Sequence, residues 1–135
     1  MKNLSCTGFL IPFGFPGFKK DPSKGNDKAG KAAPRNISPK EAKAMMDAGT
    51  PYTLLDVRTE GEFEGGHIKG AMLIPVDEIA SRAEKKLPDK NATILVYCQS
   101  GARSARAARA LAGMGYANIY NFGGIMSWPY DIVNG

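Results

Sequence analysis

The sequence contains few residues of the types that hold metals or cross-link chains. Among 135 residues there are two cysteines, Cys6 and Cys98, and one histidine, His67. Two cysteines are too few for a disulfide framework, and Cys6 lies in a stretch without regular patterning, so we expect no structural disulfide. One histidine and two distant cysteines do not make a usual zinc ligand set. The sequence therefore predicts a protein without a metal or another cofactor.

Long apolar runs are also missing. No segment has the roughly 18 consecutive apolar residues of a membrane-spanning helix. Residues 1–18 carry four of the six phenylalanines, but prolines and glycines interrupt them, and the stretch lacks the regions of a signal peptide. We therefore expect a cytoplasmic protein. The alternative is an exported, lipid-anchored protein whose true start lies upstream, because Leu4-Ser5-Cys6 is similar to a lipoprotein cleavage site.

The composition is that of a soluble globular protein, with 43% hydrophobic and 23% charged residues, and the length suits one domain. The net charge of +5 is unevenly distributed. Residues 19–43 hold eight basic and three acidic residues, whereas residues 44–135 hold nine basic and ten acidic residues. A basic run of this kind is usually a solvated tail, so we expect no nucleic-acid partner. We predict an irregular tail and linker at residues 1–35 and one domain at residues 36–135.

Apolar runs and helix signals alternate along that domain. Strands are predicted at residues 53–57, 71–76, 92–97 and 117–122. Helices are predicted at residues 39–48, 77–87 and 102–111, followed by a final short helix holding Met126 and Trp128. Ser38 and Glu41 form a capping box for the first helix, and Thr59 and Glu62 do the same for a short turn. Such alternation indicates an α/β fold, with a mostly parallel sheet and helices on both faces.

Cys98 lies between a buried strand and a helix, where open α/β sheets bind ligands. The loop residues that follow are Gln99, Ser100, Gly101, Ala102 and Arg103. Their backbone N–H groups, together with the helix N-terminus, are expected to surround the sulfur and favour a thiolate. Gly101 is expected to supply a special backbone angle or a close approach, and Arg103 a positive charge. The alternative is that Cys98 is only a small buried hydrophobe.

Four motifs in this order resemble those of single-domain rhodaneses. They are Leu54-Leu55-Asp56-Val57-Arg58 with Glu60 and Glu62-Phe63, then Gly66-His67-Ile68-Lys69-Gly70-Ala71, then Val96-Tyr97-Cys98-Gln99-Ser100-Gly101-Ala102-Arg103-Ser104, and finally Gly123-Gly124 with Trp128. The similarity runs from about Ile37 to Trp128. It implies the three-layer rhodanese-like fold, with about five mostly parallel strands and helices on both faces.

The resemblance implies a sulfurtransferase of the thiosulfate sulfurtransferase type. Cys98 would take the outer sulfur of a small anionic donor, thiosulfate or a persulfide, and pass it as a cysteine persulfide to an acceptor. The acceptor would be cyanide or a thiol, either a small thiol or a thioredoxin-like protein, and the enzyme is expected to be a monomer. Residues 99–103 would bind the substrate, and Arg103 would also pin the loop.

Three further positions have a structural interpretation beside the functional one. An ion pair between Asp56 and Arg58 that holds the loops is favoured over direct substrate contact, although Arg58 stays among the substrate-binding candidates. His67 matches a structural turn of the family, so we do not assign it as a base. Trp128 is expected in the core or a pocket wall.

Gln99 departs from the family pattern, in which Arg or Lys often follows the cysteine. The weaker positive field predicts a preference for a bulkier or protein-bound persulfide over thiosulfate. Two other classes of protein are alternatives: a non-catalytic rhodanese-like module for sulfur carriage or protein interaction, and a cysteine-based phosphatase or arsenate reductase. The second is disfavoured because only four residues separate Cys98 from Arg103, which leaves little room for a tetrahedral oxyanion.

Overall fold

The structure is a computed structural model, and it describes residues 33–134. The five strands are β1 (Arg35–Asn36), β2 (Thr53–Asp56), β3 (Met72–Leu73), β4 (Thr93–Cys98) and β5 (Asn118–Gly124). The four α-helices are α1 (Pro39–Asp47), α2 (Glu60–Glu64), α3 (Ile79–Lys86) and α4 (Ala102–Gly113). Two 3₁₀ turns, η1 (Val76–Glu78) and η2 (Ile125–Ser127), complete the fold.

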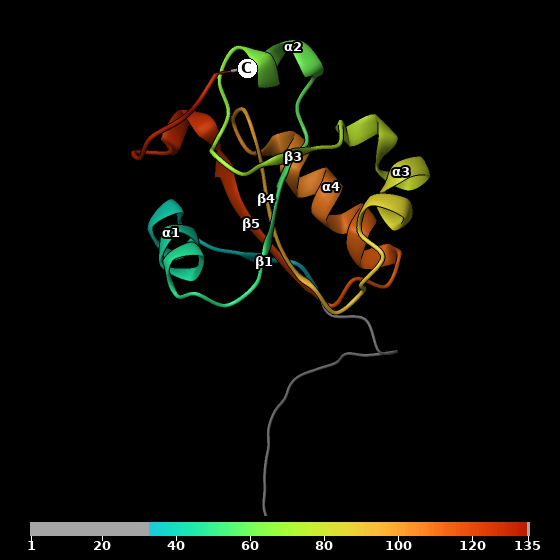
Figure 1. Ribbon diagram of the computed structural model, residues 1–135. Coiled ribbons are helices and arrows are strands. Elements are labelled where there is room, and N and C mark those ends of the chain that lie inside the picture. The colour runs from blue at the N-terminus through green and yellow to red at the C-terminus, as the bar shows by residue number, and fades with distance from the viewer. Residues whose placement is uncertain (1–32, 135) are drawn as a thin grey trace, which may run out of the picture. The chain divides into compact units, whose positions relative to one another are not determined.

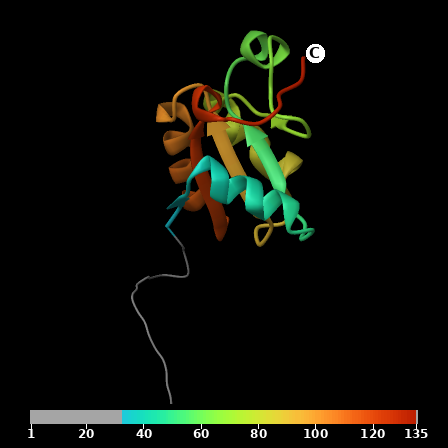
Figure 2. The same cartoon turned by 90° about the vertical axis from the view of Figure 1, so that its left-hand side faces the viewer.

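The strands form a single sheet in the order β1-β5-β4-β2-β3, and every neighbouring pair is parallel. Helix α1 covers one face of the sheet, and α3 and α4 cover the other (Figures 1 and 2). A sheet covered on both faces needs apolar residues on both sides of its central strands, and five of the six residues of β4 are buried. The predicted α/β fold with its parallel sheet of about five strands is confirmed.

Two apolar clusters hold the helices to the sheet. Leu55, Val96 and Leu111 belong to the cluster on the side of α3 and α4, and this cluster also contains Cys98. Leu95 and Phe122 belong to the cluster under α1. The two clusters take alternate residues of β4, as the two-residue period of a strand requires.

Local signals place several helix ends. Ser38 caps α1 with its side chain, and the reciprocal bond from Glu41 is present, so the predicted capping box is confirmed. Helix α1 ends at Asp47, and Gly49 follows the cap with φ +87°, the backbone region where glycine is favoured.

Five expectations for the helices and strands need correction, the last of them for strand β3. Strand β1, which pairs with β5, was not expected, because two polar residues carry no strand pattern. The segment from Thr59 to Glu62 begins a short helix, α2, rather than a turn. The expected helix at 77–87 starts as a 3₁₀ turn, and the final helix is the 3₁₀ turn η2, with Trp128 just after it.

Strand β3 is shorter than predicted. It spans Met72–Leu73, although Ile74 and Val76 still donate backbone hydrogen bonds to β2 and the residue that follows it, Val57. Pro75 lies between them and has no N–H to donate, so the pairing continues without a regular strand.

The predictions for the tail lie outside the described residues. These are the irregular Phe-rich stretch, the unpaired Cys6 and most of the basic linker. Within residues 33–134, no helix is both long enough and apolar enough to span a membrane. The boundary predicted near residue 35 and the cytoplasmic location stay predictions.

Candidate active site

The loop that carries Cys98 is short and closes on the cysteine sulfur. Cys98 is the last residue of β4, and α4 begins at Ala102, so residues 99–101 form the whole connection. Gly101 has φ +116°, which strongly favours glycine, and its backbone N–H donates to Cys98 Sγ at 2.9 Å. A Cβ at Gly101 would meet nothing closer than 3.6 Å. Of the two reasons proposed for this glycine, the structure therefore shows the backbone angle.

A bulge in β5 shapes the floor of this loop. Val96 pairs with Asn121, but Cys98 pairs with Gly124, so β5 has one residue more than β4 at this point. Bulges of this kind often lie beside active sites and redirect the chain. Gly124 consequently lies directly under the loop: a Cβ there would be 2.1 Å from the carbonyl oxygen of Gln99. Only glycine fits at this position.

The cysteine is buried, with an exposed fraction of 1%. Burial raises the pKa of the Cys98 thiol. Hydrogen bonds from the Ser104 side chain and from the amides of Ser104, Gly101 and Ser100 outweigh this effect, so the pKa lies below the ordinary value for cysteine. A thiolate accepts these hydrogen bonds better than a thiol. The surroundings of the sulfur therefore favour the nucleophilic form.

Arg103 does not present a free charge to this loop. Its guanidinium makes two hydrogen bonds to the carboxylate of Glu62, at 2.8 and 2.9 Å. The Glu62 carboxylate also accepts the backbone N–H of Thr59 at 2.9 Å and so completes the cap of α2. The bond to Arg103 and the cap together lower the pKa of Glu62 to about 2. Arg103 thus ties the first turn of α4 to α2, which fits the expectation that it pins the loop.

Asp56 and Arg58 form a buried ion pair. Their exposed fractions are 0% and 3%, and Arg58 Nη2 lies 2.6 Å from Asp56 Oδ2. The same nitrogen donates to the carbonyl of Gly66 at 2.7 Å, and Nη1 donates to Gln99 Oε1 at 3.3 Å. The ion pair that holds the loops is therefore present, and the guanidinium hydrogen-bonds the Cys98 loop through the Gln99 side chain.

His67 and Trp128 contact groups other than the cysteine sulfur. His67 Nδ1 lies 2.9 Å from the carbonyl oxygen of Phe63, and the two rings stack with centroids 3.7 Å apart. Trp128 is buried in the cluster under α1 and makes an edge contact with Tyr130. No hydrogen bond joins either side chain to Cys98 in residues 33–134. Both positions fit the structural interpretations given to them.

Ser104 lies beside the loop, although the sequence predicted no role for it beyond its place at the end of the third motif. It is fully buried on the first turn of α4, and its hydroxyl lies within hydrogen-bond distance of the carbonyls of Gly101 and Gly123 and of Asn121 Oδ1. Its polar groups also help to lower the pKa of Cys98. A serine among alanines in a buried helix stripe, six positions after the cysteine, is the signal that identifies it. Glu62 was likewise assigned only to a cap.

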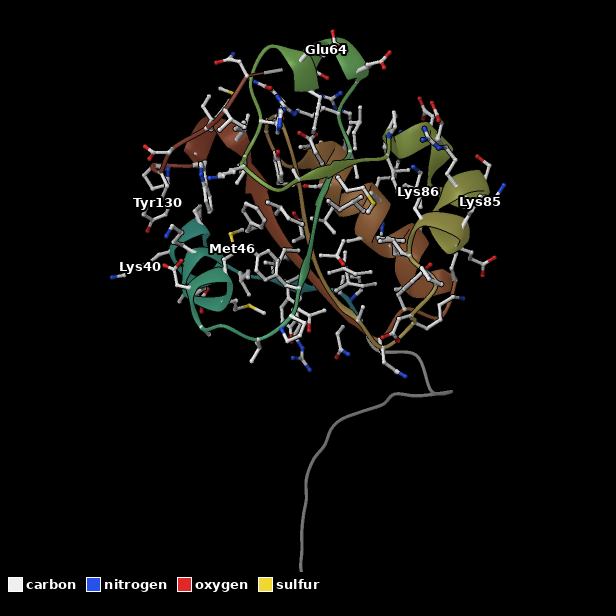
Figure 3. All side chains as sticks on the ribbon, in the orientation of Figure 1. Lys40, Met46, Glu64, Lys85, Lys86 and Tyr130 are labelled. Carbon is white, nitrogen blue, oxygen red and sulfur yellow. The ribbon has the colours of Figure 1, made fainter. Side chains whose placement is uncertain are left out.

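The surface of residues 33–134 has at least three hollows, and two of them are compared with the Cys98 loop below. The one beside the loop has a volume of about 400 Å³, and its lining includes Arg58, Gln99, Met126 and Ile132. A larger one of about 730 Å³ lies beside α1 and includes Met46 and Tyr130, which Figure 3 labels, but no residue of the Cys98 loop. Residues 33–134 contain no group of three or more His, Cys, Asp or Glu side chains suited to a metal ion.

Comparisons with known proteins agree with this geometry. Residues 38–130 match the family model for the rhodanese-like domain. Thiosulfate sulfurtransferase PspE of Escherichia coli (strain K12) is 39% identical over 81 residues, covering 60% of this chain and 78% of that protein. The uncharacterized protein YqhL of Bacillus subtilis (strain 168) is 45% identical over 76 residues, covering 56% of this chain and 59% of that protein. A solved structure of a rhodanese with anions from E. coli aligns with a TM-score of 0.60 and 35% identity, covering 63% of this chain and 100% of that one.

Proposed function

Because the chain belongs to the rhodanese-like domain family, which includes relatives named sulfurtransferases, we propose that it transfers sulfur through a persulfide on Cys98. The observation that carries this proposal is the cysteine sulfur at the carboxyl end of β4. It accepts the Gly101 N–H at 2.9 Å, in surroundings that lower its pKa. A thiolate held in this way is a nucleophile that needs no general base.

The reaction has two steps that balance without a proton donor. In the first, the Cys98 thiolate attacks the outer sulfur of the donor. A sulfur–sulfur bond forms on Cys98, the bond inside the donor breaks, and the donor leaves as sulfite from thiosulfate or as a thiolate from an organic persulfide. In the second, an acceptor thiolate or cyanide attacks the outer sulfur, and Cys98 leaves as a thiolate. In each step the electron pair of the broken sulfur–sulfur bond goes to the leaving group.

The surroundings of Gln99 support a donor whose sulfur is attached to a bulky, weakly charged carrier. The Arg58 guanidinium, which hydrogen-bonds the Gln99 side chain, is already paired with Asp56. The hollow beside the loop instead has apolar residues at its edge, since Met126 is 71% and Ile132 49% exposed. Thiosulfate carries two negative charges and has no apolar part to bury, so an organic or protein-bound persulfide is the better match. The proposed acceptor is a small thiol or a thioredoxin-like protein.

The test is sulfur loading followed by intact-mass measurement. The protein is incubated with thiosulfate and, separately, with an alkyl persulfide. We expect the mass of one added sulfur atom, located on Cys98 by peptide mapping and released by cyanide as thiocyanate. The Cys98→Ser variant should take up none. If the folded wild-type protein gains no sulfur from either donor, the catalytic proposal is wrong and a non-catalytic module is indicated; release of phosphate from an aryl phosphate would indicate the phosphatase class.

A further inference from the structure

Two exposed apolar side chains, Met126 and Ile132, border the hollow beside the Cys98 loop. Residues 33–134 expose four large apolar side chains, and the other two, Tyr52 and Tyr130, line the larger hollow beside α1. Met126 is 71% exposed, so most of its side chain lies outside the hollow, where only a molecule larger than the hollow reaches it. Exposed apolar side chains that gather at one hollow are typical of a surface that binds a partner.

Backbone hydrogen bonds hold both of these side chains against the site. The N–H of Met126 donates to the carbonyl of Gln99 at 3.2 Å. The residue after Ile132, Val133, exchanges two backbone hydrogen bonds with His67, each of 2.7 Å. The two apolar side chains therefore form a surface that exists before a partner binds, and this reduces the entropic cost of binding.

The charged side chains in the lining of the hollow are already compensated. The lining contains Arg58 and Glu62. Arg58 is paired with Asp56 at 2.6 Å, and its exposed fraction is small. Glu62 is paired with Arg103 at 2.8 Å. The lining itself therefore gives an approaching molecule little electrostatic preference.

Helix α2 adds negative charge at the edge of the hollow through Glu60 and Glu64. Both side chains are exposed, and each directly precedes a glycine of the lining. Figure 3 shows Glu64 on this helix, and the last described residues of the chain lie beside the helix in both ribbon views (Figures 1 and 2). The ion pairs within residues 33–134 include neither carboxylate. The edge of the hollow therefore combines apolar and acidic side chains.

We propose that this edge, the rim formed by Met126, Ile132, Glu60 and Glu64, recognises a polypeptide acceptor whose reactive cysteine has apolar and basic neighbours. The proposal rests on the proposed function and specifies its acceptor. A large apolar side chain beside that cysteine covers Met126 and Ile132, and basic side chains approach the two glutamates. A small anionic thiol has neither group, and the same carboxylates repel it.

Sulfur transfer to such an acceptor needs no further reactant. The peptide thiolate forms a bond to the outer sulfur of the Cys98 persulfide. The bond between that sulfur and Cys98 Sγ breaks, and its electron pair goes to Sγ. The peptide leaves as a persulfide, and Cys98 returns to the thiolate. The rim contacts only the neighbours of the attacking cysteine, so it determines which acceptor is chosen.

The test uses three synthetic peptides that differ only beside a single cysteine. One has leucine and lysine neighbours, one has serine in place of leucine, and one has glutamate in place of lysine. The purified Cys98 persulfide is mixed with each peptide, and loss of the added sulfur is followed by intact mass. Lysine also lowers the pKa of a peptide thiol. The ratio of two peptide rates is therefore compared between wild type and variant, because the effect of the thiol pKa cancels in that comparison.

Two double variants remove the two parts of the rim. Met126→Ser with Ile132→Ser should reduce the preference for leucine over serine about fivefold to tenfold, as expected for a lost apolar contact. Glu60→Gln with Glu64→Gln should reduce the preference for lysine over glutamate about threefold at low salt. The wild-type preference for lysine should disappear at about 1 M salt. Tyr52→Ser is the matched control: it removes an exposed apolar side chain from the other hollow and should keep both preferences.

Either double variant can overturn the proposal, by keeping the wild-type value of the preference that it should lose. A wild-type protein that reacts equally with all three peptides overturns it too. The two double variants change different segments, so if one does not fold, the other still decides. A wild-type protein that gains no sulfur fails at the proposed function instead. One that passes its sulfur to cyanide but does not distinguish the peptides refutes only the choice of acceptor.

Discussion

Substitution of Gly124 by alanine tests whether close packing under the loop holds the cysteine in its hydrogen bonds. The added Cβ would lie 2.1 Å from the carbonyl oxygen of Gln99 and 2.7 Å from the Cα of Ser100. Both are backbone atoms, so rotation of a side chain cannot relieve the clash. Gly124 itself has an extended backbone, with φ −135° and ψ 157°, which any residue adopts. The effect of the substitution is therefore purely steric.

The size of the disturbance follows from these distances. Ordinary contact begins at 3.4 Å, so the loop would have to retreat by about 1.3 Å. Forcing extra atoms into a packed site costs about 1–3 kcal/mol of stability. A displacement of this size also exceeds the tolerance of the 2.9 Å bond from Gly101 to Cys98 Sγ, and an error of about 1 Å in an active site can cost about 100-fold in rate.

The assay combines urea unfolding with the pH dependence of Cys98 alkylation. We expect Gly124→Ala to be less stable by about 1–3 kcal/mol. The midpoint of its pH profile for Cys98 alkylation should shift upward, because the hydrogen-bond donors to the thiolate have moved away. Gly113→Ala is the matched control, because a Cβ there meets nothing within 4 Å and the position is helical; it should gain about 0.5–1 kcal/mol. A Gly124→Ala protein with wild-type stability and a wild-type alkylation midpoint would refute the reasoning.

Three further substitutions test the polar groups around the loop. Asp56→Asn leaves the Arg58 guanidinium buried without its partner and should cost about 3–5 kcal/mol, measured by urea unfolding. The lowered pKa of Glu62, about 2 against an ordinary 4.5, contributes stability that is fully present above pH 4.5 and is lost as the pH falls toward 2. The wild-type unfolding midpoint should therefore decline between pH 4.5 and pH 2, and Glu62→Gln should make this decline shallower. An unchanged decline in the variant would contradict the pairing of Glu62 with Arg103. Gln99→Arg places a cation at the hollow and should raise kcat/KM for thiosulfate relative to an alkyl persulfide severalfold, as steady-state assays with both donors would show; an unchanged ratio would exclude Gln99 as the determinant of donor preference.

Local patterns were enough for most of the secondary structure and for the position of the nucleophile. The run before Cys98 is apolar and β-branched, and the residues from Ala102 onward favour a helix, so strand, loop and helix were all predictable in place. The capping boxes at Ser38 and Thr59 join residues three apart in sequence, which is why they could be recognised without a structure. Strand β1 is the counter-example: Arg35 and Asn36 have no strand pattern of their own and form a strand because β5 offers them an edge.

The sequence by itself determined most of the order of strands and helices and the place of Cys98 at a strand end, because each depends on neighbours along the chain. Only the tertiary structure decided the bonds around that cysteine. Arg103 meets Glu62 across 41 residues, Ser104 meets Asn121 across 17, and Gly124 comes under Gln99 through a bulge between two strands. Contacts between distant segments depend on strand register and helix packing. A shift of β5 by a single residue would remove both the Ser104–Asn121 bond and the contact of Gly124 with Gln99.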